Sequence, residues 1–304
     1  MANHAGEARP GLAAETDGGE ANRWIAARLR EASDLLARQG ANPFRAGAYL
    51  RAAGTLETLE RDIAGLLADE GIEGLIALPH VGRSIATSIA EMVHSGRWVQ
   101  LERLRGTLDP VKLFQTVAGI GPKLAFDIHN HLHADSLEAL EAAAYDGRLE
   151  AVPGIGPRRQ AGIRHALAAM LQRRRPQRPP GAALAALPAA ALLLDVDREY
   201  RAKAAADALP KIQPRRFASD DKPWLPILHA QRGDWHFTAL FSNTPRAHEL
   251  GRTRDWVVIY FHTDSEPEGQ ATVVTEHFGP LSGLRVVRGR ERESGEAHAA
   301  AGGA

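Results

Sequence analysis

The chain contains no cysteine. This absence excludes a disulfide framework, a thiolate nucleophile and any zinc or iron-sulfur site with cysteine ligands. An excess of either charge is also missing, because 37 Lys and Arg residues balance 37 Asp and Glu residues. A uniformly basic protein that coats polyanions is therefore excluded, and any surface for nucleic acid must be local.

Long apolar runs are missing as well, since no stretch of the sequence approaches the roughly 20 apolar residues of a membrane-spanning helix. The first residues, MANHAGEARP, lack the basic-then-apolar order of a secretory signal peptide. A cytoplasmic location is therefore expected. Residues 1–21 and 294–304 are rich in Ala, Gly and Glu without periodicity, so we expect disordered tails there.

What is present is enough for about two domains, because 44% of the 304 residues are apolar. The chain changes character once, at the proline- and arginine-rich segment RRRPQRPPGAALAALP, which predicts a linker over residues 176–190. Apolar residues before the linker recur at helical spacing. The expected fold is therefore multidomain, and its N-terminal half is all-α.

The C-terminal part, residues 191–293, has a different pattern. The segments WHFTALF, DWVVIYFH, ATVVTEHF and LRVVRGRE are short, rich in β-branched or aromatic residues and separated by turn residues, which is typical of strands. One candidate helix, residues 197–209, follows the apolar run LLLDV. This part is expected to be a small α+β domain, mainly β.

The most informative feature is a motif that occurs three times, as LPHVGRSIATSI at 78–89, VAGIGPKLAFDI at 117–128 and VPGIGPRRQAGI at 152–163. Two glycines surround one aliphatic residue, and a helix is expected to follow; only the first copy departs, with His80 in place of the leading glycine. Such a turn lets the backbone approach another molecule closely. The free amides and the dipole at the start of the next helix favour a phosphate.

Basic residues gather near the third copy. The stretch from Ala151 to Gly181 contains seven arginines and no Asp or Glu, a charge of +7: Arg158, Arg159, Arg164, Arg173, Arg174, Arg175 and Arg178. Pro122 and Pro157 suit the first helical position, where no amide hydrogen is required. A stretch of this charge is expected to contact several phosphates, and the binding should depend strongly on salt.

These motifs match the helix-hairpin-helix, which binds the DNA backbone without sequence specificity. Their arrangement resembles the N-terminal region of the X-family DNA polymerases over residues 22–172. The resemblance starts with NPFRAGAYLRAAGTLETL at 42–59 and continues through the three motifs. It implies a first helical domain over 22–106, which includes the first hairpin, and a tandem helix-hairpin-helix domain over 107–175.

The resemblance implies that the hairpins bind gapped, nicked or duplex DNA. Arg45 falls where the family places a basic residue near a 5′ phosphate, although a solvated arginine that flanks a helix is an equal alternative. No cofactor is required, but the family's hairpins can hold a monovalent cation, K⁺ or Na⁺, here on the backbone of Gln115, Val117 and Ile120. The expected DNA-binding residues are Arg45, Gly82, Arg83, Ser84, Gly119, Gly121, Lys123, Leu124, Gly154, Gly156, Arg158, Arg159 and Arg164.

This chain departs from the family's repair members, which use a lysine in the first domain to form a Schiff base with an abasic sugar. The aligned position is Ser88, the neighbouring basic position is Ser84, and the first lysine of the whole chain is Lys112. A serine hydroxyl cannot form an imine, and arginine stays protonated. We therefore expect no lyase activity and assign no catalytic residue.

An enzymatic alternative rests on the C-terminal part. Asp195 and Asp197 in LLLDVD, with Asp255 or Glu276 as a remote third carboxylate, could hold Mg²⁺ in a nucleotidyltransferase or a nuclease. No Gly-Ser turn precedes this segment, and the domain is short for a polymerase palm and thumb. We interpret Asp195 and Asp197 instead as a strand end and a helix cap.

Histidines in HNHLHAD offer a second metal candidate, because His129 and His133 lie four residues apart. A solvated helix end is the preferred interpretation. The sequence thus predicts a bacterial, nucleoid-associated DNA-binding protein of repair or processing. The C-terminal domain has no assigned role, and docking of a protein partner is one alternative for it.

Overall fold

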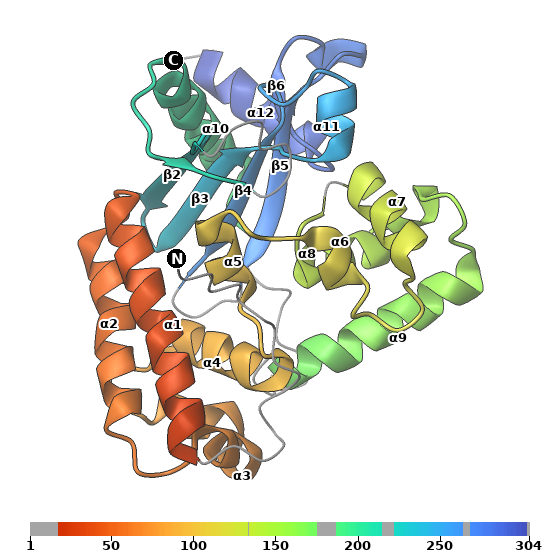
Figure 1. Cartoon of the computed structure of the whole chain (residues 1–304). Helices are drawn as coiled ribbons and strands as arrows, with labels where there is room; N and C mark the ends of the chain where they lie inside the picture. Colours follow the sequence, from red (N-terminus) through yellow and green to blue (C-terminus); the bar gives the residue numbers. More distant parts are fainter. Residues whose placement is uncertain (1–17, 133, 175–186, 215–221, 264–267, 303–304) are drawn as a thin grey trace.

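The computed structural model of the chain describes residues 18–132, 134–174, 187–214, 222–263 and 268–302 (Figure 1). Within these ranges, no helix is both long and apolar enough to cross a membrane. Helices occupy the N-terminal half, and a sheet follows in the C-terminal half. The order confirms the multidomain expectation of an all-α half followed by an α+β region.

The first domain consists of five helices, and side chains cap the N-termini of the second and third of them. The Asn42 side chain accepts a hydrogen bond from the Phe44 amide, and Asp62 does the same for Gly65. Such caps satisfy amides that have no partner inside the helix. The five helices are α1 Gly18–Arg38, α2 Pro43–Glu57, α3 Ile63–Ile76, α4 Arg83–Ser95 and α5 Val99–Arg105.

The second helical domain has a core of its own, formed around Phe114, Ile128, Leu140 and Leu167. Its α-helices are short, with 5 to 11 residues, except for the last, which has 18. They are α6 Pro110–Phe114, α7 Pro122–Leu132, α8 Leu137–Tyr145, the 3₁₀ turn η1 Arg148–Ala151 and α9 Pro157–Arg174. In Figure 1 this domain lies to the right of the first one, with α9 running back toward α4.

The C-terminal region is a six-stranded antiparallel meander in the order β1-β2-β3-β4-β5-β6. Each strand pairs with its neighbour in sequence. A two-residue turn joins β2 to β3, whereas α11 lies between β3 and β4 and η2 lies between β5 and β6. The elements are α10 Ala190–Ala205, β1 Lys211–Ile212, β2 Leu225–Arg232, β3 Trp235–Phe241, α11 Pro245–Glu249, β4 Val257–His262, β5 Gly269–Thr275, η2 Gly279–Leu281, β6 Arg285–Val287 and α12 Glu291–Gly302.

Both faces of the sheet are covered, which the central strand β4 shows most clearly. Val257, Ile259 and Phe261 pack with α10 in one core. Val258 and Tyr260 point to the other face and join the core of the first helical domain. Because side chains alternate across a strand, β4 is buried throughout and belongs to two cores at once. In Figure 1, α10 and α12 lie above the sheet, and α1, α2 and α5 lie below it.

Three boundaries differ from the sequence-based expectations. Helix α10 begins at Ala190, so Asp195 and Asp197 lie inside a helix and are neither a strand end nor a helix cap. Helix α12 covers Glu291–Gly302, where a tail was expected from residue 294. Helix α1 already begins at Gly18. Residues 176–186, most of the linker predicted over 176–190, fall outside the described residues.

Candidate nucleic-acid interface

The three hairpins have the same backbone conformation. In each copy the amide of the central aliphatic residue donates to the carbonyl three residues earlier, from Val81 to Leu78 at 3.2 Å, from Ile120 to Val117 at 3.1 Å and from Ile155 to Val152 at 3.2 Å. The following helix then opens on the second glycine, whose carbonyl accepts the first helical bond. The repeat predicted from sequence is thus a repeat in structure.

The leading position of each hairpin has a left-handed backbone. Its φ is 89° at Gly119 and 85° at Gly154, and His80 takes the same conformation with a φ of 62°. Glycine adopts this region without cost, whereas a residue with a Cβ is strained there by about 1–2 kcal/mol. The first hairpin therefore keeps its shape in spite of its departure from the motif.

The central aliphatic residue anchors each hairpin. Val81, Ile120 and Ile155 are only 3%, 4% and 8% exposed. The residues on either side are exposed, so each loop is fixed from beneath by one apolar contact while its backbone faces solvent. Burial of such a side chain is worth about 1.5–3 kcal/mol, which is enough to hold a short turn in place.

The second glycine of each hairpin, Gly82, Gly121 or Gly156, is not required by the fold. None of the three has a positive φ. A Cβ placed on any of them would meet no atom of the described chain within 4 Å. Alanine at such positions usually costs little, because it restricts the unfolded chain. A reason for glycine here must therefore lie outside the chain, in a molecule that approaches the backbone closely.

The amides at the start of the following helices are donors for such a molecule. The first turn of a helix has no acceptors within the helix, and Gly82 at the start of α4 provides no side-chain cap. Leu124 is buried, so only its backbone can contribute. Proline at the first position of α7 and α9 removes an amide that the helix would not use. The predicted donors are the amides of Gly82, Arg83, Ser84, Gly121, Lys123, Leu124, Gly156, Arg158 and Arg159.

Basic side chains surround these turns and are held only by exposed contacts. Lys123 pairs with Asp127 at 2.7 Å, and Arg83 approaches Glu73 at 3.3 Å. The Arg159 guanidinium donates to the carbonyl of Gly154 at 2.7 Å and so braces its own hairpin. Exposed pairs of this kind contribute roughly 0–1 kcal/mol, so these cations can turn to a phosphate at little cost.

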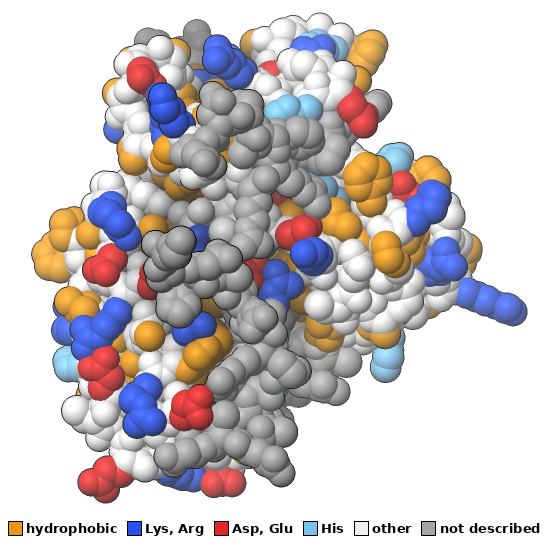
Figure 2. Space-filling model, viewed as in Figure 1, with side chains coloured by type: hydrophobic (Ala, Val, Ile, Leu, Met, Phe, Trp, Pro, Cys, Tyr) orange, Lys and Arg blue, Asp and Glu red, His pale blue; other side chains and the backbone are white. Residues whose placement is uncertain are grey.

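Arg164 is placed differently, on α9 with its guanidinium 4.3 Å from the ring centre of Tyr145. Figure 2 shows Lys and Arg side chains projecting at the right-hand edge, where α9 begins, whereas basic and acidic side chains alternate over the helices at the left. Of the seven arginines in the +7 stretch, the side chains of Arg173 and Arg174 and all of Arg175 and Arg178 lie outside the described part.

Arg45 does not lie at a hairpin. It occupies the first turn of α2, and its Nε is buried without a hydrogen-bond partner. The Asn42 side chain at the start of α2 donates to Gln231 of β2 at 2.7 Å, so this end of the helix lies against the sheet. Burial, followed by the charge of Arg45, lowers the pKa of His229 on β2 to about 3. The structure thus places Arg45 at the junction of the first domain with the sheet.

The carbonyl positions predicted to hold a cation lie together at the second hairpin. Gln115 ends α6, and the Val117 carbonyl accepts the Ile120 amide across the turn.

Ser88 and Ser84 lie on α4, where the Ser88 hydroxyl donates to the Ser84 carbonyl at 3.1 Å. This hydroxyl therefore points back into its own helix.

The carboxylates of the enzymatic alternative meet arginine. Arg285 on β6 binds Asp197 through two hydrogen bonds of 2.6 and 2.9 Å and Asp255 at 2.6 Å. Asp195, which precedes Asp197 by two residues on α10, pairs instead with Arg232 and Arg198. Within the described residues, no group of three or more His, Asp or Glu side chains could hold a metal ion.

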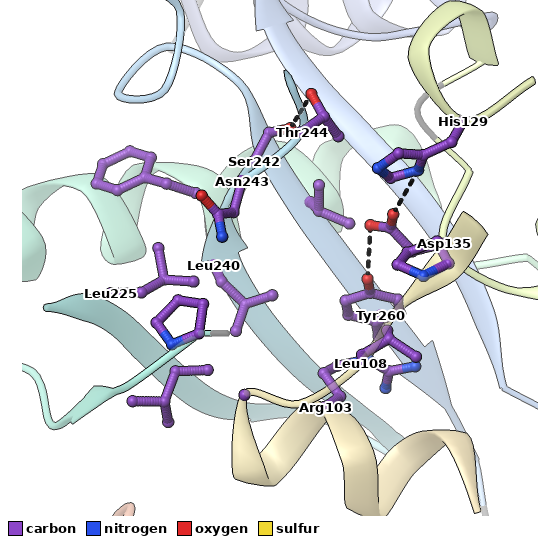
Figure 3. A pocket seen from close by; sticks show the side chains of 16 residues that line it. Arg103, Leu108, His129, Asp135, Leu225, Leu240, Ser242, Asn243, Thr244 and Tyr260 are labelled. Atoms are coloured by element: carbon purple, nitrogen blue, oxygen red, sulfur yellow. Dashed lines mark hydrogen bonds and ion pairs between the residues drawn. The ribbon is translucent and has the colours of Figure 1, made fainter. Parts of the chain in front are cut away.

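His129 corrects another expectation, because it is buried and not solvated. It is 2% exposed, and its Nδ1 lies 3.1 Å from Asp135. The Tyr260 hydroxyl donates to the same carboxylate at 2.9 Å. Figure 3 shows both side chains directed at Asp135 beside a cavity of about 80 Å³. Burial raises the pKa of Asp135, but these two hydrogen bonds and the nearby positive charges, including that of Arg103, together outweigh it, so the pKa lies below its ordinary value.

Sequence reasoning missed this polar seam between the helical half and the sheet. Arg103 on α5, 3% exposed, pairs with Glu268 at 2.7 Å, and its guanidinium lies 3.4 Å from the ring centre of Tyr260. The segment HNHLHAD contains both His129 and Asp135, yet Tyr260, which donates to Asp135, is 125 residues away in sequence. Spacing along the chain carries no signal for such a contact.

Comparison with known families agrees with the hairpin geometry. A helix-hairpin-helix domain model matches residues 20–98, and a model of the SAM-like helix-hairpin-helix tandem matches residues 111–167. Neither description names a polymerase, and no curated protein matches the chain. Helix-hairpin-helix domains indicate nucleic-acid binding. The N-terminal half of this chain thus contains two regions, residues 20–98 and 111–167, that are similar to helix-hairpin-helix domains.

Proposed function

We propose that the chain binds DNA through its backbone phosphates, without sequence specificity, and serves DNA repair or processing. The observation that carries the proposal is the open space around Gly82, Gly121 and Gly156. The fold leaves these positions free, next to helix starts with unused amides, so a phosphate can approach the backbone. Contacts to phosphates carry no base information, which accounts for the lack of sequence specificity.

The resemblance to the N-terminal region of X-family polymerases supports a finer proposal. It implies gapped, nicked or duplex DNA as the ligand, and we also propose a bacterial, cytoplasmic setting. It also suggests a monovalent cation on the backbone of Gln115, Val117 and Ile120, where carbonyl oxygens are suitable ligands. Arg45, in the first turn of α2, is the residue that we propose beside a 5′ phosphate.

Binding to labelled duplexes of two unrelated sequences tests the main proposal. Both should bind with the same affinity, and the affinity should fall linearly in a log-log plot against salt, by about 0.9 per phosphate contacted. Gapped and nicked duplexes, with K⁺ or with a bulky organic cation, test the finer proposals. A strong sequence preference, or an affinity that does not change with salt, would contradict the proposed mode of binding.

The same assay run with Mg²⁺ addresses the enzymatic alternative. We expect DNA of unchanged length, because Arg285 already neutralises Asp197 and Asp255. A magnesium-dependent product that disappears in the Asp195→Ala, Asp197→Ala double variant would instead support a nucleotidyltransferase or a nuclease.

We further propose that the first domain has no lyase activity. The Ser88 hydroxyl stands where the chemistry needs an amine, and it is 7% exposed and bonded within α4. Incubation with an incised abasic duplex and borohydride should leave no covalent adduct. A trapped adduct would overturn this proposal, and peptide mapping would then identify the amine.

A further inference from the structure

A second surface of the molecule combines aromatic and cationic groups away from the hairpins. The C-terminal groove, as we call it, is an open cavity of about 530 Å³ between the end of α11, the end of β5 and the start of α12. Its volume lies within the range of about 300–1,000 Å³ that small-molecule sites occupy. The residues that matter most are Leu250, Trp256, His277, Phe278 and Arg288.

Phe278 stands at the rim of the groove and is 84% exposed. Its position is nevertheless well defined, because the Glu276 carboxylate accepts the amides of His277 at 2.8 Å and of Phe278 at 3.1 Å. The same turn is closed by backbone bonds between Glu276 and both Gly283 and Leu284. The fold buries almost none of this large apolar ring, although the turn that carries it is fixed. The ring is therefore suited to stack on a partner.

Arg288 supplies the charge on the inner wall. Its guanidinium lies 5.1 Å from the ring centre of Trp256. Burial lowers the pKa of this guanidinium, and the nearby carboxylates of Glu291 and Glu276 do not make up the difference. The cation is thus partly desolvated and incompletely neutralised, which favours an anionic ligand.

The groove also lies on the side of the sheet that meets the tandem hairpins. Helix α8 packs against β5, and the charge of Arg148, just before the third hairpin, reaches Arg288. A ligand that is both aromatic and anionic, and that continues from DNA held by the hairpins, is an unpaired nucleotide. Stacking of a base on an aromatic side chain next to a cation is the common mode of binding for single strands.

We propose that the C-terminal groove binds an unpaired nucleotide of a DNA strand, with the base against Phe278 and the phosphate at Arg288. This inference rests on the DNA binding proposed for the hairpins, and it assigns the C-terminal region a role in recognising single-stranded ends or gaps. Base identity is left unread, because the aromatic face accepts any base.

The test compares a blunt duplex with the same duplex carrying a short single-stranded extension that contains 2-aminopurine. The full-length chain should bind the extended duplex more tightly and change the 2-aminopurine fluorescence. Phe278→Ala should weaken binding of the extended duplex about tenfold and leave the blunt duplex unaffected. Arg288→Gln should act in the same direction. Leu187→Ala, which removes another exposed apolar side chain outside the groove, is the control and should change neither.

The outcomes separate this inference from the function on which it rests. Equal binding of the two duplexes by the wild type, or equal weakening of both by Phe278→Ala, would overturn the groove as a nucleotide site. Either result would also be expected if the groove docks a protein. The proposed function would survive both, because it depends on binding of the blunt duplex and fails only if that binding is absent.

Discussion

At the scale of single residues, the hairpins separate two reasons for glycine. Gly119 and Gly154 are needed for their left-handed backbone. Gly82, Gly121 and Gly156 have an ordinary backbone and empty surroundings, so neither conformation nor packing explains them. The sequence shows both kinds as identical letters of one motif, and only the structure distinguishes them.

His80 provides a test of the first kind. Its φ of 62° should strain an exposed residue that has a Cβ. We therefore expect His80→Gly to raise the free energy of unfolding, by up to about 1 kcal/mol after the entropy cost of glycine is counted. Gly154→Ala, the reverse change at the third hairpin, should lower it by about 1 kcal/mol. Chemical denaturation measures both, and a destabilised His80→Gly variant would show that the imidazole itself holds the turn.

At the scale of elements, the contact between α10 and β6 explains two carboxylates that the sequence offered as metal ligands. Asp197 is 1% exposed, and Arg285 joins it to Asp255. A buried carboxylate requires a compensating cation, whether a metal or a guanidinium. The sequence shows the carboxylates but not which cation meets them, because Arg285 is 88 residues from Asp197.

Arg285→Leu should therefore lower the free energy of unfolding by about 3–5 kcal/mol, since it leaves the buried Asp197 carboxylate without its cation. Asp195→Asn is the matched control on the same helix. Its carboxylate is 35% exposed and paired at the surface, so the loss should stay below about 1 kcal/mol. Urea titrations of both variants measure the difference. Equal, small losses would mean that Asp197 and Asp255 do not depend on Arg285.

The elements that the sequence predicted well are those whose pattern is local. The three hairpins and strands β3 to β6 follow from glycine spacing and β-branched runs, whereas strands β1 and β2 were missed. LLLDVD was misread because an apolar run suits a strand or a helix equally well, and only the packing of Leu193, Val196 and Tyr200 on the sheet decides for α10. The Ala-rich C-terminus forms α12 because Ser294 is fully buried there and donates to the Arg290 carbonyl while accepting the Val287 amide.

At the scale of the whole molecule, the first helical domain and one face of the sheet share a core. Tyr260 and Val258 of β4 pack among the helices of the first domain, and a polar seam of Arg103, Asp135 and His229 continues the contact. Composition indicated two regions joined by a linker. It could not indicate that they close on each other, because that contact joins residues far apart in sequence.

Acid should loosen this seam. The Nε2 of His229 lies 3.0 Å from the Gln39 oxygen and its Nδ1 lies 3.0 Å from the Thr238 hydroxyl, which suits a neutral ring. Burial, followed by the charge of Arg45, lowers the pKa of His229 from 6.5 to about 3 and that of His262 well below 6.5. Because the folded state resists protonation, this stability is fully present above the unfolded pKa of 6.5.

The stability is then lost as the pH falls from that value toward the folded pKa. His229 should destabilise the fold by about 2 kcal/mol at about pH 5, and His262 should act in the same direction. Denaturation curves between neutral pH and pH 5 measure this loss. In His229→Gln, the unfolding free energy should fall less steeply with decreasing pH. His131→Gln, at an exposed site on α7, should show the same pH dependence as the wild type. Stability that does not change over this range would contradict the neutral, buried state of the two rings.

In the proposed binding mode, DNA phosphates approach the backbone at the second glycine of each hairpin. The most direct measurement is the affinity of a Gly121→Ala, Gly156→Ala double variant for a blunt duplex, alongside its unfolding free energy. We predict an unfolding free energy within about 1 kcal/mol of the wild type. We also predict an affinity about 10- to 100-fold weaker, because a methyl group blocks charge-assisted hydrogen bonds at two sites. An intact fold with unchanged affinity would contradict this binding mode.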